Sequence, residues 1–211
     1  MLAYFHGFAS GPASTKAQLV RSRLAELGHE LVIPDLAPDF TRQTITTQLA
    51  IAEQMLAGEP AILMGSSLGG YLAALVAARR PERVRALILL APAFAFAPRW
   101  EAQLGPDVMA HWRRHGVMPV MHYGREREEL LSVELLDDAR RHPDEPDPVA
   151  PALVIAGRFD DAVPLDSVQA FAAKRPEREL VVYDAGHQLT EVLEPMWERM
   201  RQFLSRFGIG R

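Results

Sequence analysis

The chain has 211 residues, of which 48% are hydrophobic and 24% charged, and its net charge is −4 at pH 7. This length and composition fit one domain of a soluble globular protein with a sizeable core. Acidic and basic residues are interspersed without a long basic block, which argues against nucleic acid as a partner. The absence of cysteine excludes disulfides, thiolate catalysis and zinc sites built on sulfur.

The N-terminal stretch is typical of a strand and not of a secretion signal, because residues 1–6 lack a basic start and a longer apolar core. No apolar run approaches the roughly 18 residues that a membrane-spanning helix needs. We therefore expect a cytoplasmic protein without a membrane span.

Short apolar runs alternate with longer helical patterns. The predicted strands are Leu2–Phe5, Leu31–Ile33, Ala61–Met64, Ala86–Leu90, Ala152–Ala156 and Leu180–Tyr183. Their uniformly apolar character favours a parallel sheet that is covered on both faces. The predicted helices are Thr15–Leu27, Thr41–Ala57 with Thr41 as N-cap, Ser67–Arg80, Leu165–Lys174 and Thr190–Arg206. This alternation predicts a three-layer α/β fold with a mostly parallel sheet of about six strands.

Residues 93–149, here called the insertion, break this rhythm because they separate the fourth and fifth predicted strands by far more than a usual crossover. We interpret them as a helical, cap-like insertion in a single domain of residues 1–211, lying over the C-terminal edge of the sheet. Their aromatic side chains either pack a small core of the insertion or line an apolar pocket. Phe94, Trp100 and Trp112 are the candidates for substrate binding.

The motif Gly65-x-Ser67-x-Gly69 follows a predicted strand and precedes a predicted helix. A sharp strand-to-helix turn exposes a serine hydroxyl, and the helix N-terminus adds free N–H groups. Small residues two positions before and after the serine let the backbone turn without collision. Ser67 is therefore the candidate nucleophile, whereas the adjacent Ser66 lacks the glycine spacing.

A serine nucleophile needs a base and a group that orients the base. His187 follows the last predicted strand, at the sheet edge where parallel sheets place their ligand sites. Asp160 and Asp161 follow the preceding strand, and either carboxylate is placed to orient His187 or to cap the next helix. The order serine, acid, histidine matches one known class of triad.

An oxyanion site needs two convergent backbone donors. The N–H of Leu68, directly after Ser67, is one candidate. The N–H of Phe8 is the other, because the loop after the first strand lies at the point where we expect the strand order to reverse. His6 either touches the substrate or holds this loop by a hydrogen bond.

Other polar residues are weaker candidates for a functional site. His111 and His115 have a helical metal spacing, but no carboxylate lies between them, and we predict no metal site. Four arginines in the insertion either recognise an anionic substrate or are solvated surface. They are Arg99, Arg113, Arg114 and Arg125.

These residues together resemble the α/β-hydrolase superfamily, in particular its small, single-domain bacterial esterase-like members. The matching segments are His6-Gly7-Phe8-x-Ser10-x-Pro12-x-Ser14-x-Lys16-Ala17, Gly65-Ser-Ser-Leu-Gly-Gly-Tyr71, Asp160-x-x-Val163-Pro164 and Gly186-His187. The resemblance spans nearly the whole chain except the insertion. It implies a triad of Ser67, His187 and Asp160 with backbone donors at Phe8 and Leu68.

The expected function is hydrolysis of a carboxylic ester or thioester of a small to medium apolar substrate through an acyl-enzyme, without a cofactor. One alternative keeps the triad but acts on amide or carbon–carbon bonds. The other is a non-catalytic ligand-binding protein on the same fold. The sequence leaves the oligomeric state and the substrate open.

Overall fold

The computed structural model of the protein describes residues 1–210. Its central sheet has five strands in the order β1-β2-β3-β6-β7, and all neighbouring pairs are parallel. The strands are β1 (Leu2–Phe5), β2 (Ala61–Ser66), β3 (Val84–Leu90), β6 (Ala152–Gly157) and β7 (Arg178–Tyr183). The predicted mostly parallel sheet is confirmed, although it is one strand smaller than expected.

The segment predicted as a sixth strand, Leu31–Ile33, meets the sheet only at a single bridge between Val32 and Ala3 of β1. Pro34 follows directly and has no N–H with which to extend the ladder. Val32 lies on one side of β1 and β2 lies on the other. The order in which successive segments are added to the sheet therefore changes side at β1, as we expected for a ligand site at this edge.

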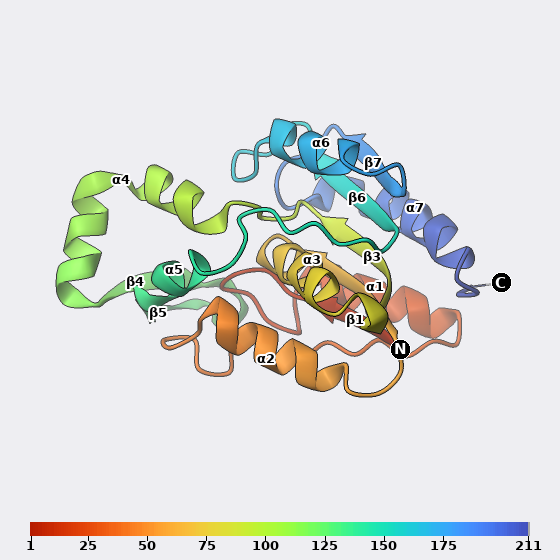
Figure 1. Ribbon diagram of the computed structural model, residues 1–211, viewed down its shortest axis with the longest axis horizontal. Coiled ribbons are helices and arrows are strands. Elements are labelled where there is room, and N and C mark those ends of the chain that lie inside the picture. Colours follow the sequence, from red (N-terminus) through yellow and green to blue (C-terminus); the bar gives the residue numbers. More distant parts are fainter. Residues whose placement is uncertain (211) are drawn as a thin grey trace.

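Helices cover both faces of the sheet (Figure 1). Their bounds are α1 (Thr15–Glu26), α2 (Ile45–Met55), α3 (Leu68–Arg79), α6 (Leu165–Ala173) and α7 (Leu193–Ser205), with short 3-10 turns at Pro81–Arg83, Tyr123–Arg125 and Thr190–Val192. Successive strand residues point to opposite faces. In β2, Leu63 packs in the core of α2, α3 and α6, and Ile62 in the core of α1 and α7. The predicted three layers are confirmed.

Helix α2 begins later than predicted because Thr44, and not Thr41, is its N-cap. The Thr44 hydroxyl accepts from the N–H of Thr47 at 3.0 Å, and the Thr47 hydroxyl accepts from the N–H of Thr44 at 2.9 Å. This reciprocal pair satisfies free donors of the first turn. The carbonyl of Thr41 instead accepts from the N–H of Ser132 in the insertion, at 2.9 Å.

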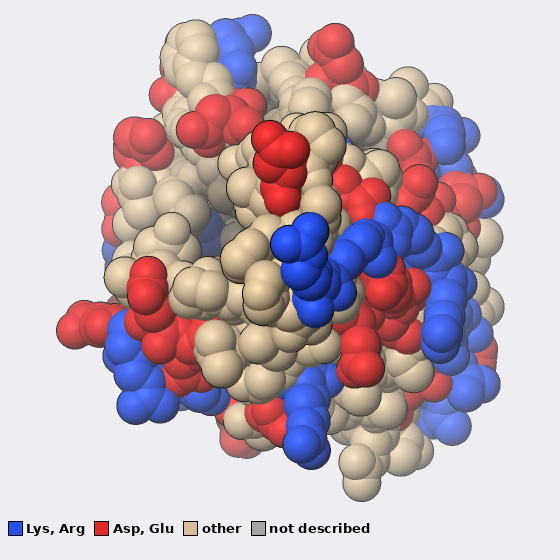
Figure 2. All heavy atoms as spheres, turned by 90° about the vertical axis from the view of Figure 1, so that its left-hand side faces the viewer, with Lys and Arg blue, Asp and Glu red and all other residues tan. Residues whose placement is uncertain are grey.

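The insertion is not wholly helical, which corrects the prediction. It contains α4 (Phe96–His115), the antiparallel hairpin of β4 (Val117–His122) and β5 (Arg127–Ser132), and the short α5 (Glu134–Ala139). Gly105, at φ 77°, and Pro106 kink α4. The insertion forms the end of the molecule opposite the two termini (Figure 1). Figure 2 shows that this end carries acidic and basic side chains side by side.

Within residues 1–210, no helix has both the length and the apolar character that crossing a bilayer requires.

Candidate active site

Ser67 occupies a strained turn between β2 and α3, with φ 53° and ψ −119°. Residues other than glycine rarely adopt this conformation, and it persists only where the surroundings enforce it. The N–H of Ser67 donates to the carbonyl of Leu90 at 2.9 Å, and the carbonyl of Ser67 accepts from the N–H groups of Ala93 at 3.0 Å and Tyr71 at 3.1 Å. The turn leaves Ser67 partly exposed to a cavity, whereas Ser66 is buried in β2.

The two glycines of the motif are required by close backbone contacts. A Cβ on Gly65 would lie 2.3 Å from the carbonyl oxygen of Gly69, and one on Gly69 would lie 2.1 Å from that of Phe5. Both distances are far below van der Waals contact, and neither obstacle is a flexible side chain. Helix α3 therefore packs against the strand ends so closely that only glycine fits.

Three side chains that are far apart in the sequence form one hydrogen-bonded chain. Nε2 of His187 lies 3.0 Å from Oγ of Ser67. Nδ1 of His187 lies 2.8 Å from Oδ2 and 3.0 Å from Oδ1 of Asp160. Because an ionised carboxylate only accepts, Nδ1 carries the hydrogen and Nε2 is left to accept from the serine hydroxyl. This arrangement has the geometry that removal of the serine proton requires.

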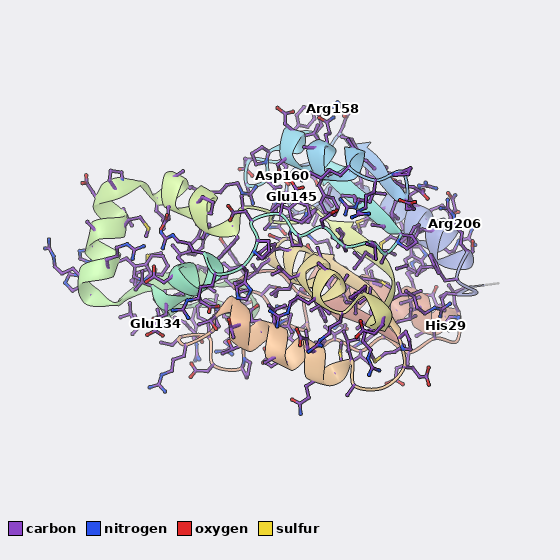
Figure 3. All side chains as sticks on the ribbon, in the orientation of Figure 1. His29, Glu134, Glu145, Arg158, Asp160 and Arg206 are labelled. Atoms are coloured by element: carbon purple, nitrogen blue, oxygen red, sulfur yellow. The ribbon has the colours of Figure 1, made fainter. Side chains whose placement is uncertain are left out.

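Asp160, and not Asp161, is the carboxylate that meets His187. Its side chain is only 2% exposed, and Oδ1 also accepts from the N–H groups of Val163 at 2.7 Å and Ala162 at 2.9 Å. Burial alone raises the pKa of Asp160, but the hydrogen bonds from His187 and the backbone outweigh it and hold that pKa below its ordinary value. Asp161 is exposed and makes no side-chain hydrogen bond in the described part of the chain. Figure 3 shows Asp160 on the side of the sheet that faces the insertion.

The loop after β1 passes beside the serine. A Cβ on Gly7 would lie 3.6 Å from Cβ of Ser67. Leu68 is the first residue of α3, so its N–H lies outside the intrahelical ladder, and across residues 1–210 neither this N–H nor that of Phe8 has a backbone or side-chain acceptor. The two donors proposed for the oxyanion are therefore both available.

His6 holds this loop in place. Its Nδ1 donates to the carbonyl of Gly7 at 3.0 Å, and its Nε2 accepts from the N–H of Leu36 at 3.2 Å. These two bonds fix the neutral imidazole, and burial lowers the pKa of His6 in the same sense. Of the two roles that the sequence left open, the hydrogen bonds favour the structural one.

A cavity of about 1050 Å³ opens over Ser67 and His187, between the loop after β1, the start of α4 and the hairpin tip. Trp100 lines it, with its ring centroid 4.8 Å from that of Phe8 and 5.5 Å from that of Phe96. This aromatic group forms the apolar part of the cavity wall.

Phe94 and Trp112 do not line the cavity, which corrects their assignment to the substrate site. Phe94 is 2% exposed and packs against Phe171 of α6 with its ring tilted, at 4.4 Å between ring centroids. Trp112 is fully buried, and its indole N–H donates to the carbonyl of Leu131 at 3.0 Å. Both rings pack the protein core, so of the three predicted aromatics only Trp100 is available to a ligand.

Sequence reasoning missed the position of Lys16 next to this site. Its Nζ donates to the carbonyl of Gln188 at 2.6 Å, which ties α1 to the residue after His187. Burial lowers the pKa of Lys16 to about 8, against the opposing effect of the Asp160 and Glu191 carboxylates. The signal in the sequence is helical spacing: Lys16 stands four and eight residues before Val20 and Leu24, which are buried on the same helix.

A family model described as UPF0227, an uncharacterised protein family, matches residues 1–205. The chain belongs to this family. It has the α/β-hydrolase fold, because solved structures of such proteins superpose on nearly its whole length. Mouse alpha/beta hydrolase domain-containing protein 10 has a TM-score of 0.81 at 22% identity, covering 98% of this chain and 90% of that one. Est1E from Butyrivibrio proteoclasticus has a TM-score of 0.78 at 22% identity, with coverages of 97% and 86%.

A curated relative is the palmitoyl-protein thioesterase ABHD10, mitochondrial, of Bos taurus. The two are 28% identical over an alignment of 177 residues, which covers 77% of this chain. The chain spans 58% of the length of that relative.

Proposed function

We propose that this UPF0227 protein is a serine hydrolase that cleaves a carboxylic ester or a thioester through an acyl-enzyme. The observation that carries the proposal is the hydrogen-bonded chain from Asp160 through His187 to the hydroxyl of Ser67. The strained backbone at Ser67 supports it further, because such strain is costly and is typical of sites where a side chain must be presented to a reactant.

In the proposed reaction, His187 takes the proton of Ser67 as the hydroxyl oxygen attacks the acyl carbon. The N–H groups of Phe8 and Leu68 donate to the oxyanion, and Asp160 stabilises the imidazolium that forms. His187 then protonates the leaving oxygen or sulfur. A water molecule, deprotonated by His187, attacks the acyl-enzyme and releases the acid and the free serine.

The relatives support an ester or thioester as the bond that is cleaved. The bovine relative is called a palmitoyl-protein thioesterase, and a solved structure called an esterase, from Pyrococcus furiosus, shares the fold. For this chain we propose an ester or thioester bond and a binding wall formed by Trp100 with its neighbours Phe8 and Phe96.

The test is hydrolysis of 4-nitrophenyl butyrate and of a butyryl thioester by the wild type and two matched variants. Ser67→Ala should lower kcat by about 10⁴-fold or more, because it removes the nucleophile. Ser66→Ala, one residue earlier in β2, should keep kcat within about tenfold. Wild-type turnover that persists in Ser67→Ala, or a folded wild type that cleaves neither substrate, would overturn the proposal.

A further inference from the structure

Arg99 is a cation that has neither a hydrogen-bond acceptor for its side chain nor an ion-pair partner within residues 1–210. It lies in the first turn of α4 and lines the cavity that contains Ser67 and His187. Its Nε and Nη1 atoms are buried and make no hydrogen bond, and in the described residues its side chain forms no ion pair. A buried charged donor without an acceptor is strongly unfavourable. By contrast, Arg178, whose side chain is fully buried, donates through Nη1 and Nη2 to the carbonyls of Phe171 and Pro148 and to the carboxylate of Asp147, and only its Nε lacks an acceptor in residues 1–210.

In residues 1–210, the nearby acid Asp160 makes no hydrogen bond or ion pair with Arg99. Burial lowers the pKa of the Arg99 guanidinium, and the Asp160 carboxylate opposes this shift. However, both oxygens of Asp160 bind His187, and Oδ1 also accepts two backbone N–H groups. If Arg99 took an oxygen of Asp160, it would compete with the contacts that orient His187.

The other cations of the cavity wall are already engaged. Arg125 pairs with Glu129 at 2.7 Å, and Lys16 donates to the carbonyl of Gln188. The wall carries three cationic side chains, Lys16, Arg99 and Arg125, against the two acids Asp35 and Glu126, although the whole chain has a net charge of −4. Gln103, one turn after Arg99 on α4, also lines the cavity and offers a neutral donor.

We propose that the ester or thioester substrate carries an anionic oxygen group, a carboxylate or a phosphate, which Arg99 binds in this cavity. The inference rests on the proposed function and adds a charge requirement to it. Trp100 would contact the apolar part of the same substrate, since it follows Arg99 on α4 and lines the same cavity. A guanidinium is suited to such a group, because its N–H donors match the spacing of carboxylate and phosphate oxygens.

The kinetic test compares neutral esters with charged esters of similar size. Phenyl acetate and 4-nitrophenyl butyrate are neutral. Mono-4-nitrophenyl glutarate carries a carboxylate on the acyl side, 4-acetoxybenzoate carries one on the leaving group, and 4-acetoxyphenyl phosphate carries a phosphate there. Arg99→Gln should lower kcat/KM for at least one charged ester by about 10- to 100-fold and leave the neutral esters within about threefold.

Arg114→Gln is the matched control, because Arg114 is exposed on the same helix and does not line the cavity. It should leave all five rates within about twofold. An equal loss for neutral and charged esters in Arg99→Gln would show a purely structural role. No loss for any charged ester would likewise overturn the proposal.

A binding measurement separates this proposal from the proposed function. In Ser67→Ala, glutarate or inorganic phosphate should raise the Tm, and the shift should disappear in Ser67→Ala/Arg99→Gln but persist in Ser67→Ala/Arg114→Gln. This result would stand even if the wild type hydrolysed no ester. The anion site is refuted if neither anion raises the Tm, or if the shift survives the loss of Arg99.

Discussion

The edge of the sheet and the insertion build the two halves of the site by different means. Ser67, Asp160 and His187 follow β2, β6 and β7, and the serine turn is enforced by backbone hydrogen bonds and by glycines that admit no Cβ. The insertion supplies the opposite wall through side chains such as Trp100, which packs against the main hydrophobic core that also contains Trp112. The groups proposed to react are thus held by the backbone, and the groups proposed to face the substrate are held by side-chain packing.

The largest expected effect is a loss of kcat when a residue at the edge of the sheet is changed. Asp160→Asn should lower kcat by about 10⁴-fold, because an amide that donates to Nδ1 leaves the hydrogen on Nε2, which then cannot accept the serine proton. Asp161→Asn, at the exposed neighbouring position, should stay within about threefold. Steady-state kinetics on 4-nitrophenyl butyrate check both. A reversed pair of effects would make Asp161 the orienting acid.

The next effect distinguishes a tryptophan that packs the core, Trp112, from one that lines the cavity, Trp100. Trp112→Ala should lower the free energy of unfolding by about 3–5 kcal/mol, because it empties a fully buried position. Trp100→Ala should cost less stability and mainly raise KM for esters with longer apolar chains, since Trp100 lines the cavity.

Urea unfolding and a series of acyl-chain lengths measure these two outcomes. If Trp100→Ala left the chain-length preference unchanged, Trp100 would belong only to the core of the insertion.

The smallest effect concerns the link from α1 to the loop that carries His187. With a folded-state pKa of about 8 for Lys16 against about 10.5 in the unfolded chain, the unfolded state binds more protons between these values, so stability due to this group rises with pH. Relative to Lys16→Met, the wild type should therefore gain about 2 kcal/mol between pH 7.5 and pH 10. Unfolding curves of both proteins at the two pH values test this difference, and parallel pH dependences would contradict it.

The sequence predicted the part of the site at the sheet edge well, because the constraints on these residues are local. Uniformly apolar runs and the glycine spacing around Ser67 mark the strands and the turn, and His187 follows a strand directly. The choice between Asp160 and Asp161 depended partly on a resemblance, since the backbone conformation alone decides which of two adjacent side chains faces His187. The catalytic roles of these residues remain proposals.

The sequence predicted the insertion poorly because its structure depends on tertiary contacts. Val117–His122 became a strand through pairing with Arg127–Ser132, a partner that its own pattern does not reveal. Phe94 and Trp100 are equally aromatic in the sequence, but only the fold turns one toward Phe171 and the other toward the cavity. The cytoplasmic location and the single-domain organisation stay predictions.

The most direct test of the central claim is covalent labelling with a fluorophosphonate, followed by mass spectrometry of the labelled peptide. An activated serine should form one adduct, which fragmentation places on Ser67 and which is absent in Ser67→Ala. In His187→Ala the labelling rate should fall by at least about 100-fold. A folded wild-type protein that remains unlabelled, or an adduct on any other residue, would contradict the account.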